Sequence, residues 1–165
     1  NTIRTTNNAG TLTYSFWPQL AALVRDSSIF AKLDHAVMQS FSSKYAFALY
    51  EAVARRARLR HVFRETFTVE GIRELLGVEK GRLVPYKNLK TKAIDPALIE
   101  VNALTPYNVA LEPRLEGRKV IGFILGWGMK DEAGMRDAYA EMQRPRTGRR
   151  ERLNKMIEAH VIIED

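Results

Sequence analysis

The sequence contains no cysteine and only three histidines. The missing cysteines exclude a disulfide framework and any thiolate-bound metal. His35, His61 and His160 are too widely spaced to form a metal-ligand pattern. No apolar run approaches the roughly 20 residues that cross a bilayer, and the amino terminus has no signal-peptide pattern. We therefore expect a cytoplasmic protein with no metal, no cofactor and no membrane partner.

The sequence also lacks the motifs of the common enzyme classes. It has no Walker loop and no nucleophile elbow. Gly77 and Gly81 occur without the neighbours that a glycine-rich phosphate cradle requires. A rolling-circle nicking enzyme needs a catalytic tyrosine near a pair of histidines, and the sequence has no such pair. The tyrosines are better explained as core or phosphate-contacting residues, so we expect that the protein is not an enzyme.

Positive charge is present in excess and is concentrated in the middle of the chain. The 165 residues carry a formal charge of +7. Residues 1–41 hold three basic and two acidic side chains, residues 42–128 hold fifteen and nine, and residues 129–165 hold eight of each. A basic domain favours polyanions because each neutralised phosphate releases condensed counterions. Many basic proteins bind no polyanion, so the charge alone does not decide the function.

The amino-terminal part of the chain has a sparse pattern. The chain opens on Asn1 rather than methionine, so we expect an excised part of a longer protein, and residues 1–10 are expected to be linker-like. Thr11–Trp17 alternates β-formers with polar or small residues, which predicts a half-buried strand. A short helix is predicted at Gln19–Val24 and a short strand at Ile29–Leu33.

A helix is predicted from Lys44 to about Arg58, after the N-capping residues Ser42 and Ser43. Its expected core face recurs at helical spacing and consists of Ala46, Leu49, Tyr50, Val53 and Ala57. A dense group of arginines lies at its end and beyond: Arg55, Arg56, Arg58, Arg60 and Arg64. The helix macrodipole favours positive charge at a carboxyl end, so these arginines do not by themselves indicate a ligand.

Two more helices are predicted downstream. Thr68 is expected to cap a short helix that ends before Gly77, where a left-handed residue fits. The apolar stripe of this helix consists of Ile72, Leu75 and Leu76. After a loop, a longer helix runs over residues 85–103. Because Pro96 pushes the preceding residue out of the helical region, we expect a kink or break near Asp95.

A β-hairpin is predicted after the third helix. Tyr107–Glu112 and Lys119–Trp127 are rich in β-formers. Residues 113–118 between them contain Gly117, where a hairpin loop needs a positive φ. The order helix, short helix, longer helix and hairpin is typical of a winged helix-turn-helix, an α+β fold. In that fold the third helix enters the major groove and the hairpin wing lies beside it.

We therefore assign residues 1–128 to a winged-helix DNA-binding domain with a β-hairpin wing, and residues 129–165 to a helical, flexible basic tail. The third helix has a core side of Tyr86, Leu89, Ala93 and Ala97. Its polar side and flank, the expected DNA-reading residues, are Lys87, Asn88, Lys90, Thr91 and Lys92. The expected wing contacts are Arg114, Arg118 and Lys119. A lysine-rich helix face is also common where it is simply solvated.

Four motifs occur in a fixed order along the chain. They are SKYAFALYE at residues 43–51, YKNLK followed by AIDPA within residues 86–97, EVN at residues 100–102, and LEGRKVIG at residues 115–122. They resemble the SKYALRLYELL signature, the Y-x-x-F-K-R-R-V-L-D-P-A stretch, the E-I-N and the K-x-G-R-K-V of iteron-binding plasmid replication initiators, the Rep initiator family. The resemblance covers about Thr11 to Trp127, and the motifs are those of the carboxy-terminal of two tandem winged-helix domains.

The resemblance implies a function for the chain. Such initiators bind direct repeats (iterons) in a plasmid origin as double-stranded DNA, work with host replication proteins such as a helicase or an initiator, and repress their own promoter as dimers. Self-association is implied through an amino-terminal winged helix, which this sequence does not include. Leu89 replaces an aromatic of the family. Thr91 and Lys92 stand where two arginines are common, so the base preference of the family does not carry over.

Candidate phosphate contacts outside the third helix and the wing are Ser43, Lys44, Tyr45, Arg146, Arg149 and Arg150. The three arginines belong to residues 144–150, which are either a flexible arm along DNA phosphates or a solvated linker; the usual solvation of charge runs favours the linker. Two apolar stripes flank this segment and are expected to pack on the core or on another chain. They are Met135, Ala138, Tyr139 and Met142, and Leu153, Met156, Ile157 and Val161.

Two other functions stay open at the level of the sequence. A winged-helix transcriptional repressor without an initiator role would bind an inverted repeat near a promoter. A winged helix used for protein–protein contact would bind no DNA, and changes at Lys87, Asn88 and Lys92 would then have no DNA binding to affect.

Overall fold

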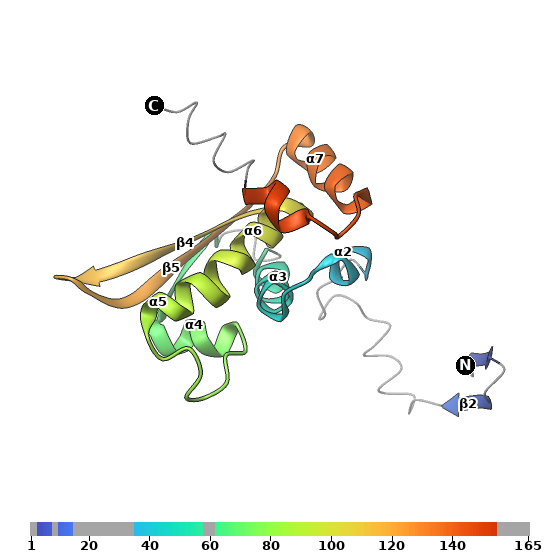
Figure 1. Cartoon of the computed structure of the whole chain (residues 1–165), viewed down its shortest axis with the longest axis horizontal. Coiled ribbons are helices and arrows are strands. Elements are labelled where there is room, and N and C mark those ends of the chain that lie inside the picture. The colour runs from blue at the N-terminus through green and yellow to red at the C-terminus, as the bar shows by residue number, and fades with distance from the viewer. Residues whose placement is uncertain (1–2, 8–9, 15–34, 58–61, 155–165) are drawn as a thin grey trace. The chain divides into compact units, whose positions relative to one another are not determined.

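The structure is a computed structural model that describes residues 3–7, 10–14, 35–57 and 62–154 (Figure 1). The chain divides into two compact units, Asn1–Lys32 and Leu33–Asp165. The predicted helix at residues 19–24 and the predicted strand at residues 29–33 lie outside the described residues.

The first unit contains a small antiparallel hairpin. Strand β1 (Ile3–Asn7) pairs with strand β2 (Gly10–Tyr14), with Ile3 opposite Tyr14. The strand expected from Thr11 is therefore found, as β2, although its described part ends at Tyr14. Strand β1 occupies positions that we expected to be linker-like, and its isoleucine and two threonines are β-branched residues that favour a strand.

Two helices open the second unit. Helix α2 (His35–Ser40) is followed by α3 (Lys44–Arg56). The expected cap of α3 is confirmed, because Ser43 Oγ accepts a hydrogen bond of 3.2 Å from the Tyr45 amide. The expected core face is confirmed for Ala46, Leu49, Tyr50 and Val53, which are buried, whereas Ala57 is only half-buried.

Strand β3 (Arg64–Thr68) and helix α4 (Val69–Leu75) follow. Strand β3 was not predicted, because the side chains of this strand are mostly exposed and show no apolar alternation. The predicted cap of α4 is confirmed, since the Gly71 amide donates to Thr68 Oγ1 at 3.0 Å. The predicted end is confirmed too, with Gly77 at a φ of 66°.

The third helical segment is continuous but changes its hydrogen-bond register. It consists of α5 (Tyr86–Leu89), the π-helical η1 (Lys90–Ile94) and α6 (Asp95–Leu104). The predicted break near Asp95 is absent: that residue keeps a φ of −59° and a ψ of −47°, and its amide donates to the Lys90 carbonyl five residues back. The π turn is how the helix accommodates Pro96, which has no amide hydrogen to donate.

The wing is formed by β4 (Tyr107–Glu116) and β5 (Lys119–Met129), and β5 lies between β3 and β4 in a three-stranded antiparallel sheet. The predicted hairpin is confirmed, but its loop is shorter than expected, because Glu116 pairs with Lys119 and leaves only two residues in the turn. Strand β4 contains Pro113, which has no amide hydrogen to donate. The proline is tolerated there because β4 is an edge strand. At the base of the wing, a side chain on Gly122 would clash with the Phe67 carbonyl oxygen of β3.

Helix α7 (Glu132–Gln143) and a helical stretch at residues 149–154 complete the described chain. Figure 1 shows both on the same side of the second unit as α6, and α7 contacts α6. The predicted apolar stripe of α7 is buried only in part, since Ala138 is buried whereas Tyr139 is exposed. Leu153 is buried, and the remainder of the second predicted stripe lies outside the described residues. Residues 129–154 thus pack as part of the second unit.

Candidate nucleic-acid interface

The third helical segment separates its side chains as the sequence predicts. Leu89, Ala93 and Ala97 are buried in the core, and the Tyr86 ring lies 6.2 Å from the Phe123 ring of β5. The opposite side faces solvent: Lys87, Thr91 and Lys92 are exposed and Asn88 is half-buried. A helix held in this way presents its polar side to a partner without disturbing its packing.

Lys90 differs from the other lysines of this segment. Its Nζ lies 3.0 and 2.9 Å from the two carboxylate oxygens of Asp95. The hydrogen bond to Asp95 raises the pKa of Lys90, so the lysine stays charged, but its charge is offset by that carboxylate. No carboxylate of a described residue forms an ion pair with Lys87 or Lys92. These two lysines are therefore better placed than Lys90 to meet an anion.

Thr91 is restricted by the backbone of its own helix. Its hydroxyl donates a hydrogen bond of 2.9 Å to the Lys87 carbonyl one turn earlier. The hydroxyl hydrogen is then not available for a phosphate oxygen. What the exposed side chain still offers is its methyl group, the part of a threonine that meets a thymine methyl in the major groove.

Arg73 of α4 fixes the turn that precedes the third helical segment. Its guanidinium is buried and donates to the carbonyls of Arg82 and Leu83, the latter at 3.0 Å. The turn contains two residues with positive φ, Gly81 at 80° and Leu83 at 51°. This role of Arg73 is not predictable from the sequence, because an arginine beside an apolar stripe has no pattern that distinguishes it from a solvated one.

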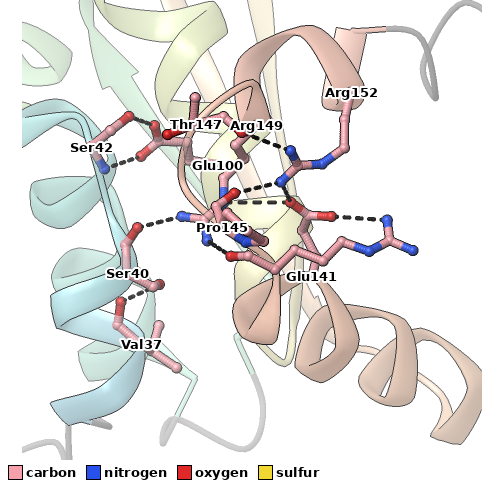
Figure 2. A network of polar contacts seen from close by, with 10 residues as sticks. Val37, Ser40, Ser42, Glu100, Glu141, Pro145, Thr147, Arg149 and Arg152 are labelled. Atoms are coloured by element: carbon pink, nitrogen blue, oxygen red, sulfur yellow. Dashed lines mark hydrogen bonds and ion pairs between the residues drawn. The ribbon is translucent and has the colours of Figure 1, made fainter.

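Glu100 of α6 holds the amino end of α3 (Figure 2). Its buried carboxylate accepts from the amides of Ser42 at 3.0 Å and Ser43 at 3.2 Å, and from the Ser42 hydroxyl. Ser43, a candidate phosphate contact, thus has its amide bound to Glu100, while its Oγ caps α3. Only its hydroxyl hydrogen remains for a phosphate. The amides of Ser42 and Ser43 are therefore not open to an anion.

Asn102, two residues further along α6, ties that helix to the wing. Its side chain donates to the Val109 carbonyl at 2.9 Å and accepts from the Val109 amide at 2.7 Å. Val101 between the two polar residues is buried. The motif at residues 100–102 is therefore explained by contacts that join α6 to α3 and to β4.

Two hollows bring some of the candidate DNA-binding residues together, but Lys87, Lys90 and the wing candidates line neither of them. The larger, of about 1010 Å³, is lined by Lys44 and Tyr45 of α3, by Thr91 and Lys92, and by the segment after α7 with Arg146 and Arg150. The smaller, of about 530 Å³, is lined by Tyr45, Asn88, Lys92 and the turn at residues 81–85. Tyr45 and Lys92 line both hollows. The polar side of the third helical segment is thus flanked by the start of α3, by the turn that Arg73 holds and by the segment after α7.

Glu141 of α7 organises the segment after that helix (Figure 2). Its carboxylate lies 3.2 Å from Arg144 Nη1, 3.4 Å from Arg149 Nε and 2.8 Å from Arg152 Nη2. Burial alone would raise the pKa of Glu141, but the hydrogen bonds and charges of Arg152 and Arg144 outweigh it and lower that pKa. The carboxylate is therefore held in its charged form.

Arg149, one of the candidate phosphate contacts, is buried and is not available to a phosphate. Its side chain is only 6% exposed, pairs with Glu141 and donates to the Ser40 carbonyl at 2.7 Å. The prediction for Arg149 is wrong, because a guanidinium enclosed by protein acceptors does not reach a phosphate. Arg146 and Arg150 are exposed and keep the predicted role as a proposal. Residues 144–150 are neither an extended arm nor a loose linker, because the arginines around Glu141 fix them.

The wing candidates Arg114, Arg118 and Lys119 are all exposed and lie around the tip of the hairpin. Figure 1 shows that tip extending beyond the helices of the second unit. A bulge accompanies the change of register between Arg114, which pairs with Gly122, and Leu115, which pairs with Val120. Bulges bend a hairpin and increase its twist, which here alters the direction of the tip.

Other kinds of site receive no support from the described part of the chain. Its residues contain no group of three or more His, Asp or Glu side chains that could hold a metal. None of the helices in the described ranges is long and apolar enough to cross a membrane.

A comparison with known families matches residues 68–127 to the model described as initiator Rep protein, WH2. The match begins at the N-cap of α4 and contains the third helical segment, β4, and β5 except for its last two residues. No curated protein matches the chain. The predicted α+β winged-helix fold is confirmed, with a three-stranded sheet beside the helices. Over residues 68–127, the chain is similar to the second winged-helix domain of initiator Rep proteins.

Proposed function

We propose that this chain binds double-stranded DNA sequence-specifically at the repeats (iterons) of a plasmid origin, and in this way takes part in the initiation of plasmid replication and in the repression of its own promoter. The observation that carries the proposal is the third helical segment of the matched domain. Its Lys87, Asn88 and Lys92 face solvent while its other side is locked into the core. A host helicase or initiator is proposed as a partner on the strength of the family alone.

The proposed roles follow from the chemistry of each side chain. Asn88 can pair bidentately with adenine, and Lys87 and Lys92 can contact guanine edges or phosphates. The Thr91 methyl can meet a thymine. Lys90 is assigned to the flank, because Asp95 neutralises it. Wing residues Arg114, Arg118 and Lys119, with Lys44 and Tyr45 of α3, are assigned to the DNA backbone, where contacts fix register without reading sequence.

The proposal is tested with duplexes selected by the protein itself from a library with a randomised centre. An initiator predicts that the selected sequence occurs as tandem repeats in the DNA that carries the gene. A selected sequence found there only as an inverted repeat near a promoter would favour the repressor. No selection of any sequence would favour a winged helix that serves protein contact.

A further inference from the structure

The larger hollow is lined by cations from three separate parts of the chain. Lys44 lies at the start of α3, Lys92 in the third helical segment, and Arg146 and Arg150 in the segment after α7. Among the described residues, no carboxylate forms an ion pair with Lys92, Arg146 or Arg150. Lys44 pairs with Glu79 at 3.3 Å, but both side chains are more than 60% exposed, so this pair is weak.

The carboxylates of the hollow cancel only part of this charge. Asp95 is paired with Lys90, whereas Glu100 keeps its negative charge, because the Ser42 and Ser43 groups that donate to it are neutral. Glu151 also lines the hollow and is exposed. Arg149 lines it too, but its charge is matched by Glu141. The balance of the hollow is therefore positive, which favours an anionic occupant.

The segment that carries Arg146 and Arg150 is held in a defined position. Arg152 donates to the carbonyls of Pro145 at 2.9 Å and Thr147 at 3.0 Å, and pairs with Glu141 (Figure 2). These contacts are on either side of Arg146. A cation on a fixed backbone loses less conformational entropy on binding than one on a free arm.

We propose that this hollow binds backbone phosphates of the duplex that the third helical segment reads, and that Arg146 and Arg150 add phosphate contacts from outside the matched winged-helix domain. The inference rests on the proposed function, because it takes Thr91 and Lys92 to lie against DNA. The hollow adjoins those two residues directly, so the strand they touch has its next phosphates beside the two arginines. Arg146 and Arg150 then contribute to affinity for any duplex and not to the choice of sequence.

The test measures the salt dependence of DNA binding by the whole chain. The probes are a duplex selected from the randomised library and a scrambled duplex of the same composition. Each lost phosphate contact lowers the salt slope by about 0.9, which is roughly an eightfold loss of affinity at 0.1 M salt. Arg146→Ala combined with Arg150→Ala should therefore reduce the slope by about two units and weaken both duplexes alike.

The matched control is Arg55→Ala combined with Arg136→Ala. It removes the same charge from two exposed arginines, on α3 and α7, that do not line the hollow. We expect this control to leave the slope within about half a unit of the unchanged protein, since long-range effects of exposed charges are screened by salt. A control that lowers the slope as much as the test pair would overturn the inference, because net charge would then explain the loss.

The outcomes separate the inference from the proposed function. If the unchanged chain prefers its selected duplex and the test pair binds with the same slope, the hollow is not part of the interface and only this inference fails. If the unchanged chain prefers no duplex, the proposed function fails and the inference with it. A loss confined to a single-stranded probe of the same sequence would also overturn the assignment to duplex DNA.

Discussion

In the third helical segment, Lys87 and Lys92 face solvent and no described carboxylate pairs with them, whereas in the basic segment at residues 144–152 the arginines divide into two kinds. Arg149 is buried against Glu141, while Arg146 and Arg150 are exposed. The two regions read alike in sequence, as clusters of positive charge. A basic cluster is therefore a candidate for binding DNA only when its side chains are not already bound to carboxylates or carbonyls of the same chain.

The motifs that carry the family resemblance also contain both side chains bound within the chain and side chains that face solvent. Ser43 caps α3, Glu100 holds the amino end of that helix, and Asn102 pins α6 to the wing. Gly122 lets β5 approach β3. Each of these positions holds one element of the domain against another. Asn88 and Thr91, on the polar side of the third helical segment, make no such contacts between the described elements, which leaves their side chains available for the DNA reading proposed above.

Replacing Glu141 should produce the largest loss of stability, and it tests whether the buried Arg149 depends on this carboxylate. Glu141→Gln leaves Arg149 buried without a full counter-charge, and breaking a buried ion pair costs about 3–5 kcal/mol of unfolding free energy. Urea denaturation followed by circular dichroism measures the loss. Glu132→Gln is the control: its pair with Arg136 is exposed and should contribute less than about 1 kcal/mol. Equal losses for the two variants would show that the Glu141 network is not structural.

The same network predicts a pH dependence. The pKa of Glu141 is below its usual value of 4.5 in the folded chain, so its contribution to stability is complete above about pH 4.5 and is lost as the pH falls through the folded pKa. The difference in unfolding free energy between the unchanged chain and Glu141→Gln should therefore shrink as the pH falls below about 5. A difference that stays constant over this range would mean that Glu141 does not titrate with a lowered pKa.

Features of the fold were predictable from the sequence where they depend on residues close together in the chain, and not where they depend on distant ones. The caps at Ser43 and Thr68 and the left-handed Gly77 follow from neighbouring residues, and all three were predicted. Strand β3 was missed because it is defined by its pairing with β5, more than fifty residues away. Of the predicted kink or break near Asp95, the break is absent: a π turn at Lys90–Ile94 keeps the helix continuous, and the rule for prolines does not foresee this.

In the candidate site, too, features that depend on neighbouring residues were predictable and those that depend on distant residues were not. The polar side of the third helical segment was predictable from helical spacing. The burial of Arg149 was not, since it depends on the Ser40 carbonyl, more than one hundred residues earlier, and on Glu141, which does not have the three- or four-residue spacing of a helical ion pair. Arg73 was missed for the same reason, because its acceptors are backbone carbonyls that no side-chain pattern reveals.

The base of the wing offers a test in the matched domain. Gly122→Ala places a methyl group against the Phe67 carbonyl, and overpacking of this kind costs about 1–3 kcal/mol of unfolding free energy. Gly128→Ala in the same strand is the control, since a Cβ there meets nothing within 4 Å. Thermal or urea unfolding measures both. If Gly122→Ala is as stable as the control, the close approach of β3 and β5 does not restrict this position.

Asn88→Ala should affect recognition while leaving stability unchanged. If Asn88 reads a base, its loss weakens binding of the selected duplex by roughly 1–3 kcal/mol and relaxes the preference at one position. Asn108→Ala, at an exposed position of β4, is the control and should change neither. Equal weakening of selected and scrambled duplexes by Asn88→Ala would instead assign Asn88 to the backbone contacts.

The smallest expected effect separates Lys92 from Lys90. Lys92→Ala should reduce the salt slope by about one unit, because its charge is available to a phosphate. Lys90→Ala should reduce it by clearly less, since Asp95 already offsets that charge. Titrations at several salt concentrations give both slopes. Equal slopes for the two variants would contradict the assignment of Lys90 to the flank.

The most direct test of the central claim is a titration of the unchanged chain against a duplex that it has selected from a randomised library, with a scrambled duplex beside it, at several salt concentrations. Sequence-specific binding predicts at least about a thousandfold preference for the selected duplex. It also predicts an affinity that falls steeply as salt rises. Equal affinity for the two duplexes, or affinity that does not change with salt, would contradict the claim that this winged helix reads DNA.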